Sequence, residues 1–195
     1  MYFDYKIATQ ALNYLAHLEG GQIDKLKALK LIYFADKYHL RKYSSLISND
    51  KYFAMQRGPV ASSTKDIAEH SSFLSSKEKE YCEKYIAPLG ENKFKSVAEI
   101  DKDQLSETNL ESLKFAYDNF GHLEPLALVN LTHHYPEWKK HEHRLKNESR
   151  IEMNLEDFFD DPTTPNINKC FEIDDSDRDI LKQDIREYIS LVGVL

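Results

Sequence analysis

The chain has 195 residues, 41% of them hydrophobic and 12% aromatic, which is enough apolar material for one domain with a buried core. Twelve tyrosines and ten phenylalanines would lie in water if the chain were unfolded, so disorder throughout is excluded. The formal net charge is −7, and residues 151–180 hold ten acidic and two basic side chains, whereas the other residues sum to +1. This acidic balance disfavours general affinity for nucleic acid.

The sequence predicts a cytoplasmic protein. No run of 18 or more apolar residues occurs that would predict a membrane-spanning helix. The first six residues lack both the basic start and the apolar stretch of a signal peptide. Cys82 and Cys170 lie far apart without a metal-binding or disulfide-framework spacing, which fits a reducing compartment. We expect both cysteines to fill apolar space rather than to react.

Helical periodicity dominates the first half of the chain. A helix is predicted over residues 5–18, with Asp4 as its cap and Gly20-Gly21 ending it. A second helix over residues 24–43 has a broad apolar face, which predicts a central helix packed on more than one side.

A turn at residues 48–50 precedes a strand-like segment, 52–55. Pro59 is then expected to sit at or just before the first turn of a helix near residues 60–70. Ser75 or Ser76 can cap a helix that Pro88 ends, and a short strand or irregular chain follows near residues 94–100.

Ser106 can begin a helix that ends at Gly121, and Pro125 can open another that breaks before Pro136. A linker over residues 161–166 and a last helix over residues 177–192 complete the chain. The predicted fold class is mainly α, a compact helical domain with a small β-ribbon or strand-like segment near 52–60 and a C-terminal helix. The domain is expected to cover residues 1–150, with residues 151–195 as an acidic segment plus helix packed on it or appended to it.

Three segments in this order resemble the Panacea domain, the SocA-like antitoxin family of toxin–antitoxin systems. They are Leu26–Asp36 (LKALKLIYFAD), Tyr52–Val60 (YFAMQRGPV), and Leu131-Thr132-His133 followed by Pro136 and Trp138. The resemblance covers about residues 5–141. Gln56-Arg57 departs from it, because a proline or an aromatic residue is more usual before the Gly-Pro pair, and this leaves open what the turn contacts.

The resemblance implies an α-rich domain that binds a cognate toxin protein and neutralises it directly. Some relatives instead deliver a toxin to a protease, so a proteolytic adaptor or general protein-interaction module, with a protease as a second partner, stays open. The family shares no catalytic residues, and none are carried over to this chain. We therefore expect no enzyme activity, no cofactor and no metal.

The residues themselves give little support for catalysis or metal binding. The densest set of metal-ligand types is His133, His134, His141, His143, Glu137 and Glu142. Pro136 is expected to break the helix that would align them, which favours capping and surface roles for these histidines. No serine lies in a Gly-x-Ser-x-Gly elbow, and six glycines form no phosphate loop.

A basic stripe on the second helix leaves a nucleic-acid-binding regulator open as a further alternative. Lys27, Lys30, Lys37 and Arg41 share one quarter of the helical wheel, with Phe34 and Tyr38 among them. Basic and aromatic side chains together can hold nucleic acid. We favour a mostly buried helix whose lysine stems run along apolar neighbours while their charged heads stay in water.

Two segments are predicted to face a partner protein. The first is the Gly58-Pro59-Val60 turn with Tyr52 and Arg57, although turn geometry alone also explains its glycine and proline. The second is the acidic stretch that contains Glu156, Asp157, Phe158 and Phe159, whose simpler interpretation is solvated chain. Its carboxylates and aromatic rings would complement a basic cleft on a toxin. Trp138 is expected to be a core anchor.

Overall fold

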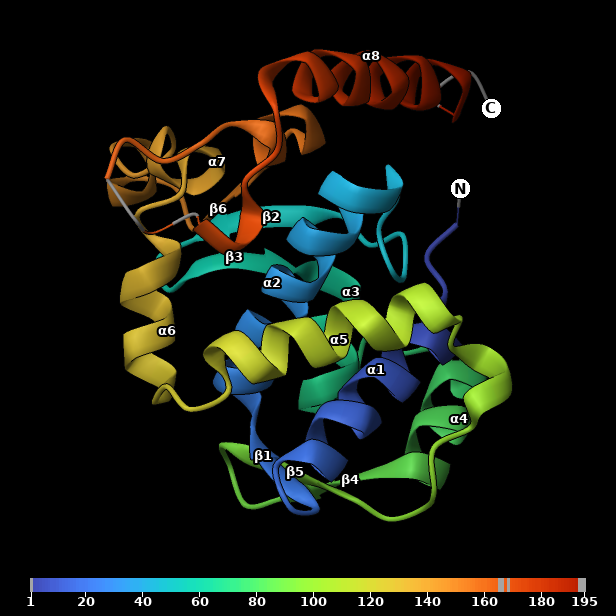
Figure 1. The fold of residues 1–195 in the computed structure, drawn as a ribbon. Helices are drawn as coiled ribbons and strands as arrows, with labels where there is room; N and C mark the ends of the chain where they lie inside the picture. Colours follow the sequence, from blue (N-terminus) through green and yellow to red (C-terminus); the bar gives the residue numbers. More distant parts are fainter. Residues whose placement is uncertain (1, 165–166, 168, 193–195) are drawn as a thin grey trace.

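The computed structural model describes residues 2–164, 167 and 169–192 (Figure 1). Its α-helices are α1 (Tyr5–Leu18), α2 (Lys25–Tyr43), α3 (Ser62–Glu69), α4 (Ser76–Tyr85), α5 (Glu107–Phe120), α6 (Pro125–Thr132), α7 (Pro136–Lys139) and α8 (Asp175–Val192). Its strands are β1 (Gln22–Asp24), β2 (Tyr52–Met55), β3 (Gly58–Ala61), β4 (Ile86–Leu89), β5 (Lys93–Ser96) and β6 (Arg150–Glu152). Its short 3₁₀ helices are η1 (Lys102–Gln104), η2 (Arg144–Lys146), η3 (Leu155–Phe159) and η4 (Lys169–Phe171). The mainly α fold class with small strands is confirmed, and none of the described helices is long and apolar enough to cross a bilayer.

Helix α2 runs through the middle of the protein, with α5 packed along it and α1 nearby (Figure 1). Fourteen of its nineteen residues are buried, which confirms the central position that its broad apolar face predicts. Aromatic stacking fixes α5 against it: Phe34 stacks on Phe120 with ring centroids 4.1 Å apart, and Tyr38 stacks on Phe115 at 3.9 Å.

One small antiparallel sheet, in the order β1-β5-β4, packs against α1. Each strand contributes one fully buried side chain, Ile23, Phe94 or Ile86, to the core. Helix α4 ends at Tyr85, not at Pro88 as predicted, because the chain turns directly into β4. Pro88 is accommodated there since β4 is an edge strand, where a missing N–H costs no ladder hydrogen bond.

The second antiparallel sheet has the order β3-β2-β6 and contains the predicted strand over residues 52–55. The β-ribbon predicted near residues 52–60 and the helix predicted near residues 60–70 are both present, but Pro59 does not lie at the first turn of that helix: it lies in edge strand β3, opposite Ala54. Helix α3 starts at Ser62 instead. The Asp50 carboxylate holds that start by accepting from the backbone N–H groups of Ser63 and Thr64, at 3.0 and 2.6 Å.

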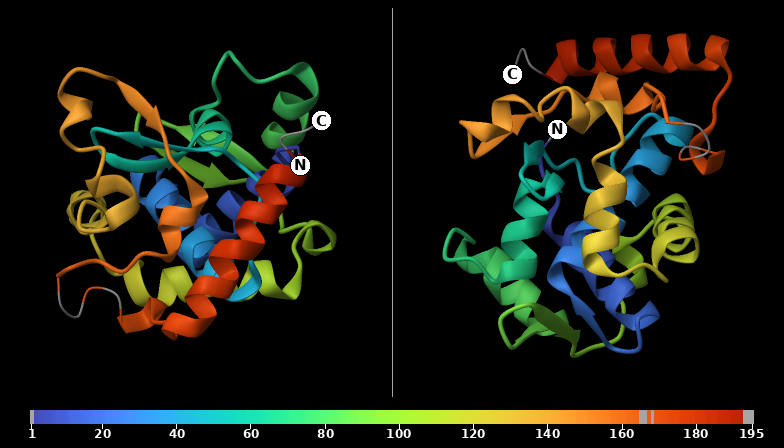
Figure 2. Two further views of the ribbon diagram at one scale, coloured as in Figure 1. Left: turned by 90° about the horizontal axis from the view of Figure 1, so that it is seen from above. Right: turned by 90° about the vertical axis from the view of Figure 1, so that its left-hand side faces the viewer.

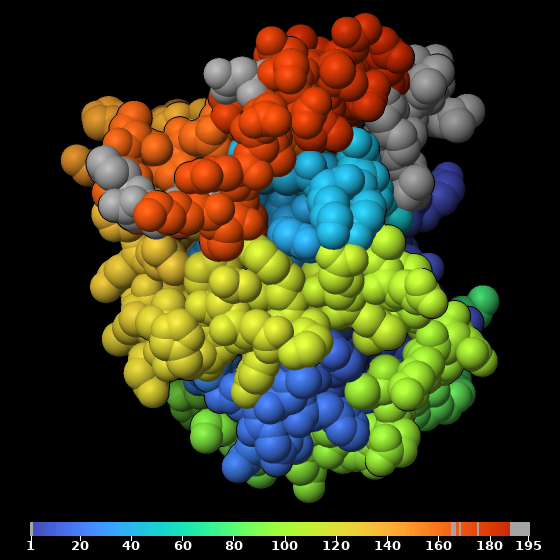
Figure 3. Space-filling model, viewed as in Figure 1, coloured from blue at the N-terminus to red at the C-terminus, as the bar shows by residue number. Residues whose placement is uncertain are grey.

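The C-terminal part packs on the rest of the fold. The expected boundary at residue 150 coincides with the first residue of β6, which pairs with β2. Phe158 and Phe159 of η3 are fully buried, so the simpler interpretation of the acidic stretch as solvated chain is wrong. Helix α8 then crosses the top of the molecule, over η3 and near the end of α2 (Figures 2 and 3). The last two residues of the predicted linker, 165 and 166, lie outside the described residues.

Substitution of Gly58 tests how closely the β2–β3 hairpin packs against Thr132 and Lys30. Its φ is +94°, and an added Cβ would lie 2.4 Å from Thr132 Oγ1 and 3.0 Å from Lys30 Nζ. Gly58→Ala should therefore lower the free energy of unfolding by about 2–4 kcal/mol, combining left-handed strain with overpacking. Gly20→Ala is the matched control, because its φ is +87° but no atom lies within 4 Å of the added Cβ. It should cost about 1 kcal/mol in denaturant titrations. Equal losses for the two variants would contradict the close packing.

Candidate functional site

Two lysines of α2 direct their charged heads into the protein. The Lys30 ammonium donates to the Pro59 carbonyl at 2.7 Å, and the Lys37 ammonium donates to Glu137 Oε1 at 2.7 Å. Both side chains are fully buried, so the prediction that these heads stay in water is wrong. The reason is that each finds an oxygen acceptor inside the fold, which offsets part of the cost of burying the charge.

The other basic groups of the stripe are also used internally. Arg41 donates to the Phe158 carbonyl at 3.1 Å and pairs with Asp161 at 2.7 Å, while Lys27 pairs with Glu19 at 2.5 Å. The cations that a nucleic-acid-binding surface would need on this helix are therefore committed to contacts within the fold.

A buried carboxylate joins two of the three segments that carry the family resemblance. Glu137 Oε1 accepts from the Tyr33 hydroxyl at 2.6 Å as well as from Lys37. Burial lowers the pKa of Lys37, and the Glu137 carboxylate opposes that shift. Burial, and next the Glu137 charge, raise the pKa of Tyr33 well above its usual value. The short helix α7 is therefore anchored to α2 through Glu137.

Two further contacts fix the hairpin strand β2 to the same framework. The Tyr52 hydroxyl donates to Asp36 at 2.6 Å, and the Trp138 indole N–H donates to the Met55 carbonyl at 2.8 Å. Burial raises the pKa of Asp36 to about 7, against the lowering effect of its hydrogen bonds. Trp138 is buried, which confirms its predicted role as a core anchor, and His133 stacks on it with ring centroids 3.7 Å apart.

The hairpin forms one wall of a groove of about 960 Å³. The other walls are the start of α2, the turn before β5 and the start of α6. The groove has apolar side chains from three of these elements, Leu26, Leu29, Met55, Val60 and Leu126. Leu126 is 67% exposed and gives the groove an accessible apolar edge.

A smaller hollow of about 180 Å³ adjoins this groove along the hairpin. It shares Met55, Val60 and Lys65 with the groove and extends to Phe73, which is 86% exposed. We call the two hollows together the hairpin groove.

Lys25 and Lys65 beside the hairpin groove have partners within the fold, whereas Arg57 has none among the described residues. Lys65 pairs with Glu69 at 2.6 Å, and the Lys25 ammonium donates to the Glu91 carbonyl at 2.8 Å. Arg57 lies exposed at the turn between β2 and β3 and makes no ion pair or hydrogen bond with any described residue. Its guanidinium is therefore free to bind an anionic group beside an apolar surface.

The residues predicted to face a partner lie in different surroundings. Arg57 lines the hairpin groove, whereas Tyr52 is 1% exposed and points into the core. Phe158 and Phe159 are likewise buried and offer no surface to a partner in this structure.

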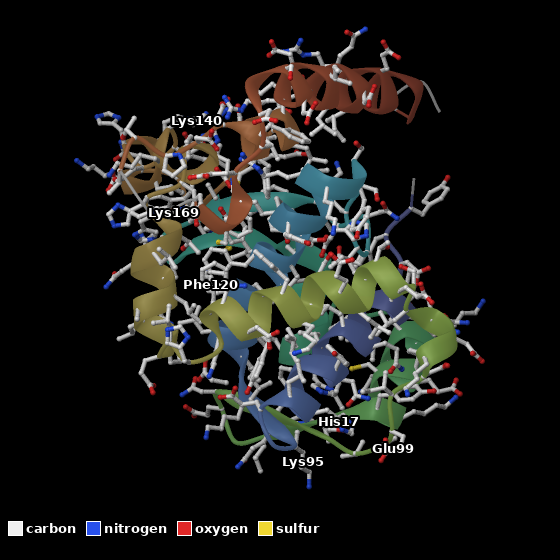
Figure 4. The ribbon with its side chains drawn as sticks, viewed as in Figure 1. His17, Lys95, Glu99, Phe120, Lys140 and Lys169 are labelled. Carbon is white, nitrogen blue, oxygen red and sulfur yellow. The ribbon has the colours of Figure 1, made fainter. Side chains whose placement is uncertain are left out.

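The two predicted acidic residues remain partly accessible. Glu156 pairs with Arg186 at 2.6 Å, and Asp157 pairs with Lys140, which Figure 4 labels near the C-terminal part. Their contact with a partner stays a prediction.

The sequence did not identify the other residues of the hairpin groove. Leu26 and Leu29 follow the apolar periodicity of α2, and Leu126 follows that of α6. Periodicity alone therefore places all three side chains in the interior. Only the tertiary arrangement shows that they line a hollow.

Among the described residues, no group of three or more His, Cys, Asp or Glu side chains is placed to hold a metal ion. His134 and His143 are exposed, as expected for surface roles, but His141 is buried. Burial raises the pKa of the Cys82 thiol to about 12, so this thiol is protonated at neutral pH.

A family model described as "Antitoxin SocA-like, Panacea domain" matches residues 29–139. The matched span holds most of α2, the β2–β3 hairpin, and Glu137 and Trp138 of α7. Comparison with curated proteins gave no match, and comparison with solved structures gave none.

Breaking the buried pair should destabilise the fold strongly. Lys37→Met leaves the Glu137 carboxylate buried without its cation, and we expect a loss of about 3–5 kcal/mol in denaturant-induced unfolding. Lys84→Ala, at the exposed Lys84–Glu80 pair on α4, should cost less than about 1 kcal/mol. A double variant, Lys37→Met/Glu137→Gln, should lose less than the sum of its single variants. A loss below 1 kcal/mol for Lys37→Met would contradict this role.

The stability of the fold should rise with pH above neutrality because of Lys30. Burial lowers its pKa to about 7, whereas in the unfolded chain the value is about 10.4. Between these values the unfolded state binds more protons, so raising the pH favours the folded state, by at most about 1.4 kcal/mol per pH unit. The free energy of unfolding of wild type minus that of Lys30→Met should therefore rise from pH 7 to pH 10. A flat or falling difference for Lys30→Met would refute the shift.

Proposed function

The chain belongs to the SocA-like antitoxin family of Panacea domains, and from this premise we propose that it binds a cognate toxin protein and neutralises it by direct contact. The observation that carries the proposal is the family match itself, which spans the buried framework and the hairpin that the framework holds. The inhibition we propose is steric and electrostatic, without a catalytic step by this chain.

We place the contact with the toxin at the hairpin groove. The partner segment that fits it carries apolar side chains to cover Leu126 and Met55, and a carboxylate to pair with Arg57. Apolar anchors surrounded by a few complementary charges are the usual composition of the energetically dominant part of an interface. The hairpin is held rigidly by Lys30 and Trp138, so its ordering adds little entropic cost to binding.

The function is tested by growth in a heterologous host. A candidate toxin from the neighbouring reading frame is expressed alone and then together with this protein. Toxicity that co-expression relieves, together with co-purification of the two proteins, is the expected result. A toxin partner that is bound but remains fully active, or toxicity that co-expression leaves unchanged, would refute neutralisation by direct contact.

The docking site is tested by reversing one charge. Arg57→Glu should weaken the binding of the toxin at least tenfold, because it replaces the exposed cation at the hairpin turn with a repelling carboxylate. Lys84→Glu makes the same change of charge on an exposed face of α4 that does not line the groove. It should leave the dissociation constant, measured by calorimetry, within twofold of wild type. Equal effects of the two variants would exclude the hairpin groove as the docking site.

A further inference from the structure

Helix α8 carries a regular row of cations that faces the acidic stretch. Arg178, Lys182 and Arg186 are four residues apart, so they lie along one face of the helix. Arg178 pairs with Asp161, Lys182 pairs with Asp160 at 2.5 Å, and Arg186 pairs with Glu156 at 2.6 Å. Charge complementarity thus runs along about two turns of α8.

The apolar contact beneath this row is small. Ile185 is buried and Leu181 is half-buried on the same face, whereas Ile180 is 59% exposed. The Arg178 and Lys182 side chains are each 22% exposed and that of Arg186 is 61% exposed, so water and salt reach all three ion pairs. Exposed ion pairs contribute little to stability and weaken with salt, and this applies most to the Arg186 pair. Within its described side chains, α8 is therefore held mainly by surface electrostatics and by a narrow apolar contact.

The surface under α8 is, in contrast, firmly built. Phe158 and Phe159 anchor η3 in the core, and the Phe158 carbonyl accepts from both Lys37 at 2.9 Å and Arg41 at 3.1 Å. Asp161 is held by Arg41 as well as by Arg178. The backbone that carries these carboxylates is consequently positioned by the body of the protein, because Arg41 also donates to the Asp160 carbonyl at 3.4 Å. The Asp161 carboxylate is fixed by Arg41 as well, whereas those of Glu156 and Asp160 contact Arg186 and Lys182 of α8.

We propose that Glu156, Asp160 and Asp161 form a docking surface for a basic amphipathic helix of the partner, and that α8 occupies this surface in the free protein as an exchangeable stand-in. The identity of that partner as the toxin rests on the function proposed above. The occupant is defined by what α8 presents: cations at every fourth position with apolar residues between them. Residues 151–161, which form this surface, hold five acidic and no basic side chains, and this favours the approach of such a helix.

The exchange is tested with a fluorescent peptide of residues 174–192 added to full-length protein. In the full-length variant Arg178→Glu/Lys182→Glu/Arg186→Glu, which we call the release variant, the resident helix is repelled from the acidic surface. We expect this variant to bind the peptide at least tenfold more tightly than wild type in anisotropy titrations, with affinity falling between 50 and 300 mM salt. A control variant, Lys79→Glu/Lys84→Glu/Lys114→Glu, carries the same change of net charge on α4 and α5 and should behave as wild type.

Two outcomes would overturn the exchange. One is that the folded release variant binds the peptide no better than wild type. The other is that it binds equally well a peptide whose three cations are replaced by glutamate. If the charge-reversed variant does not fold, the neutral variant Arg178→Gln/Lys182→Gln/Arg186→Gln takes its place in the same comparison. Adding Asp160→Asn and Asp161→Asn to the release variant should abolish peptide binding.

The peptide titration uses no toxin, so its result is independent of the proposed function. Once the toxin is identified, the release variant should bind the toxin at least tenfold more tightly than wild type does at the same salt concentration. Peptide exchange without any toxin binding would support the docking surface and refute its assignment to the toxin. Neutralisation of a toxin with no gain in the release variant would refute the docking surface as part of that interface.

Discussion

The buried contact of Lys37 with Glu137 is the constraint on which the rest of the structure depends. It places a cation and a carboxylate in the core, where each is tolerated only because the other, and the Tyr33 hydroxyl, are within hydrogen-bond distance. Helix α7 must therefore dock on α2 in one register. Through Trp138 this register sets the position of strand β2, and Lys30 sets that of β3.

This arrangement explains why separate sequence segments form one surface. Lys30, Lys37 and Arg41 of α2 hold the hairpin, α7 and η3, so these cations are not available to other molecules. The hairpin turn, in contrast, presents the exposed Arg57 in the same groove as the exposed apolar side chain of Leu126. A rigid body with an accessible turn is suited to docking on another protein, and the proposed antitoxin role uses that property.

Much of the fold could be predicted because local signals decide it. Asp4 caps α1 and Ser106 caps α5, as the sequence indicates, and the periodicity of α2 shows that it is central. Strands β1, β4 and β6 were missed because each has three or four residues and depends on pairing with a distant segment. The burial of Lys30 and Lys37 could not be predicted for a related reason. A charged side chain is expected to be exposed unless a buried acceptor for it is known, and the acceptor Glu137 lies a hundred residues from Lys37 in the sequence.

The most direct test of this account is amide hydrogen exchange measured residue by residue in wild type and in Lys37→Met. If the buried pair holds the hairpin, the amides of β2 and β3 and of α7 should lose protection in the variant, while those of α4 and of the sheet β1-β5-β4 keep theirs. Unchanged protection of the hairpin in a folded Lys37→Met protein would contradict the account.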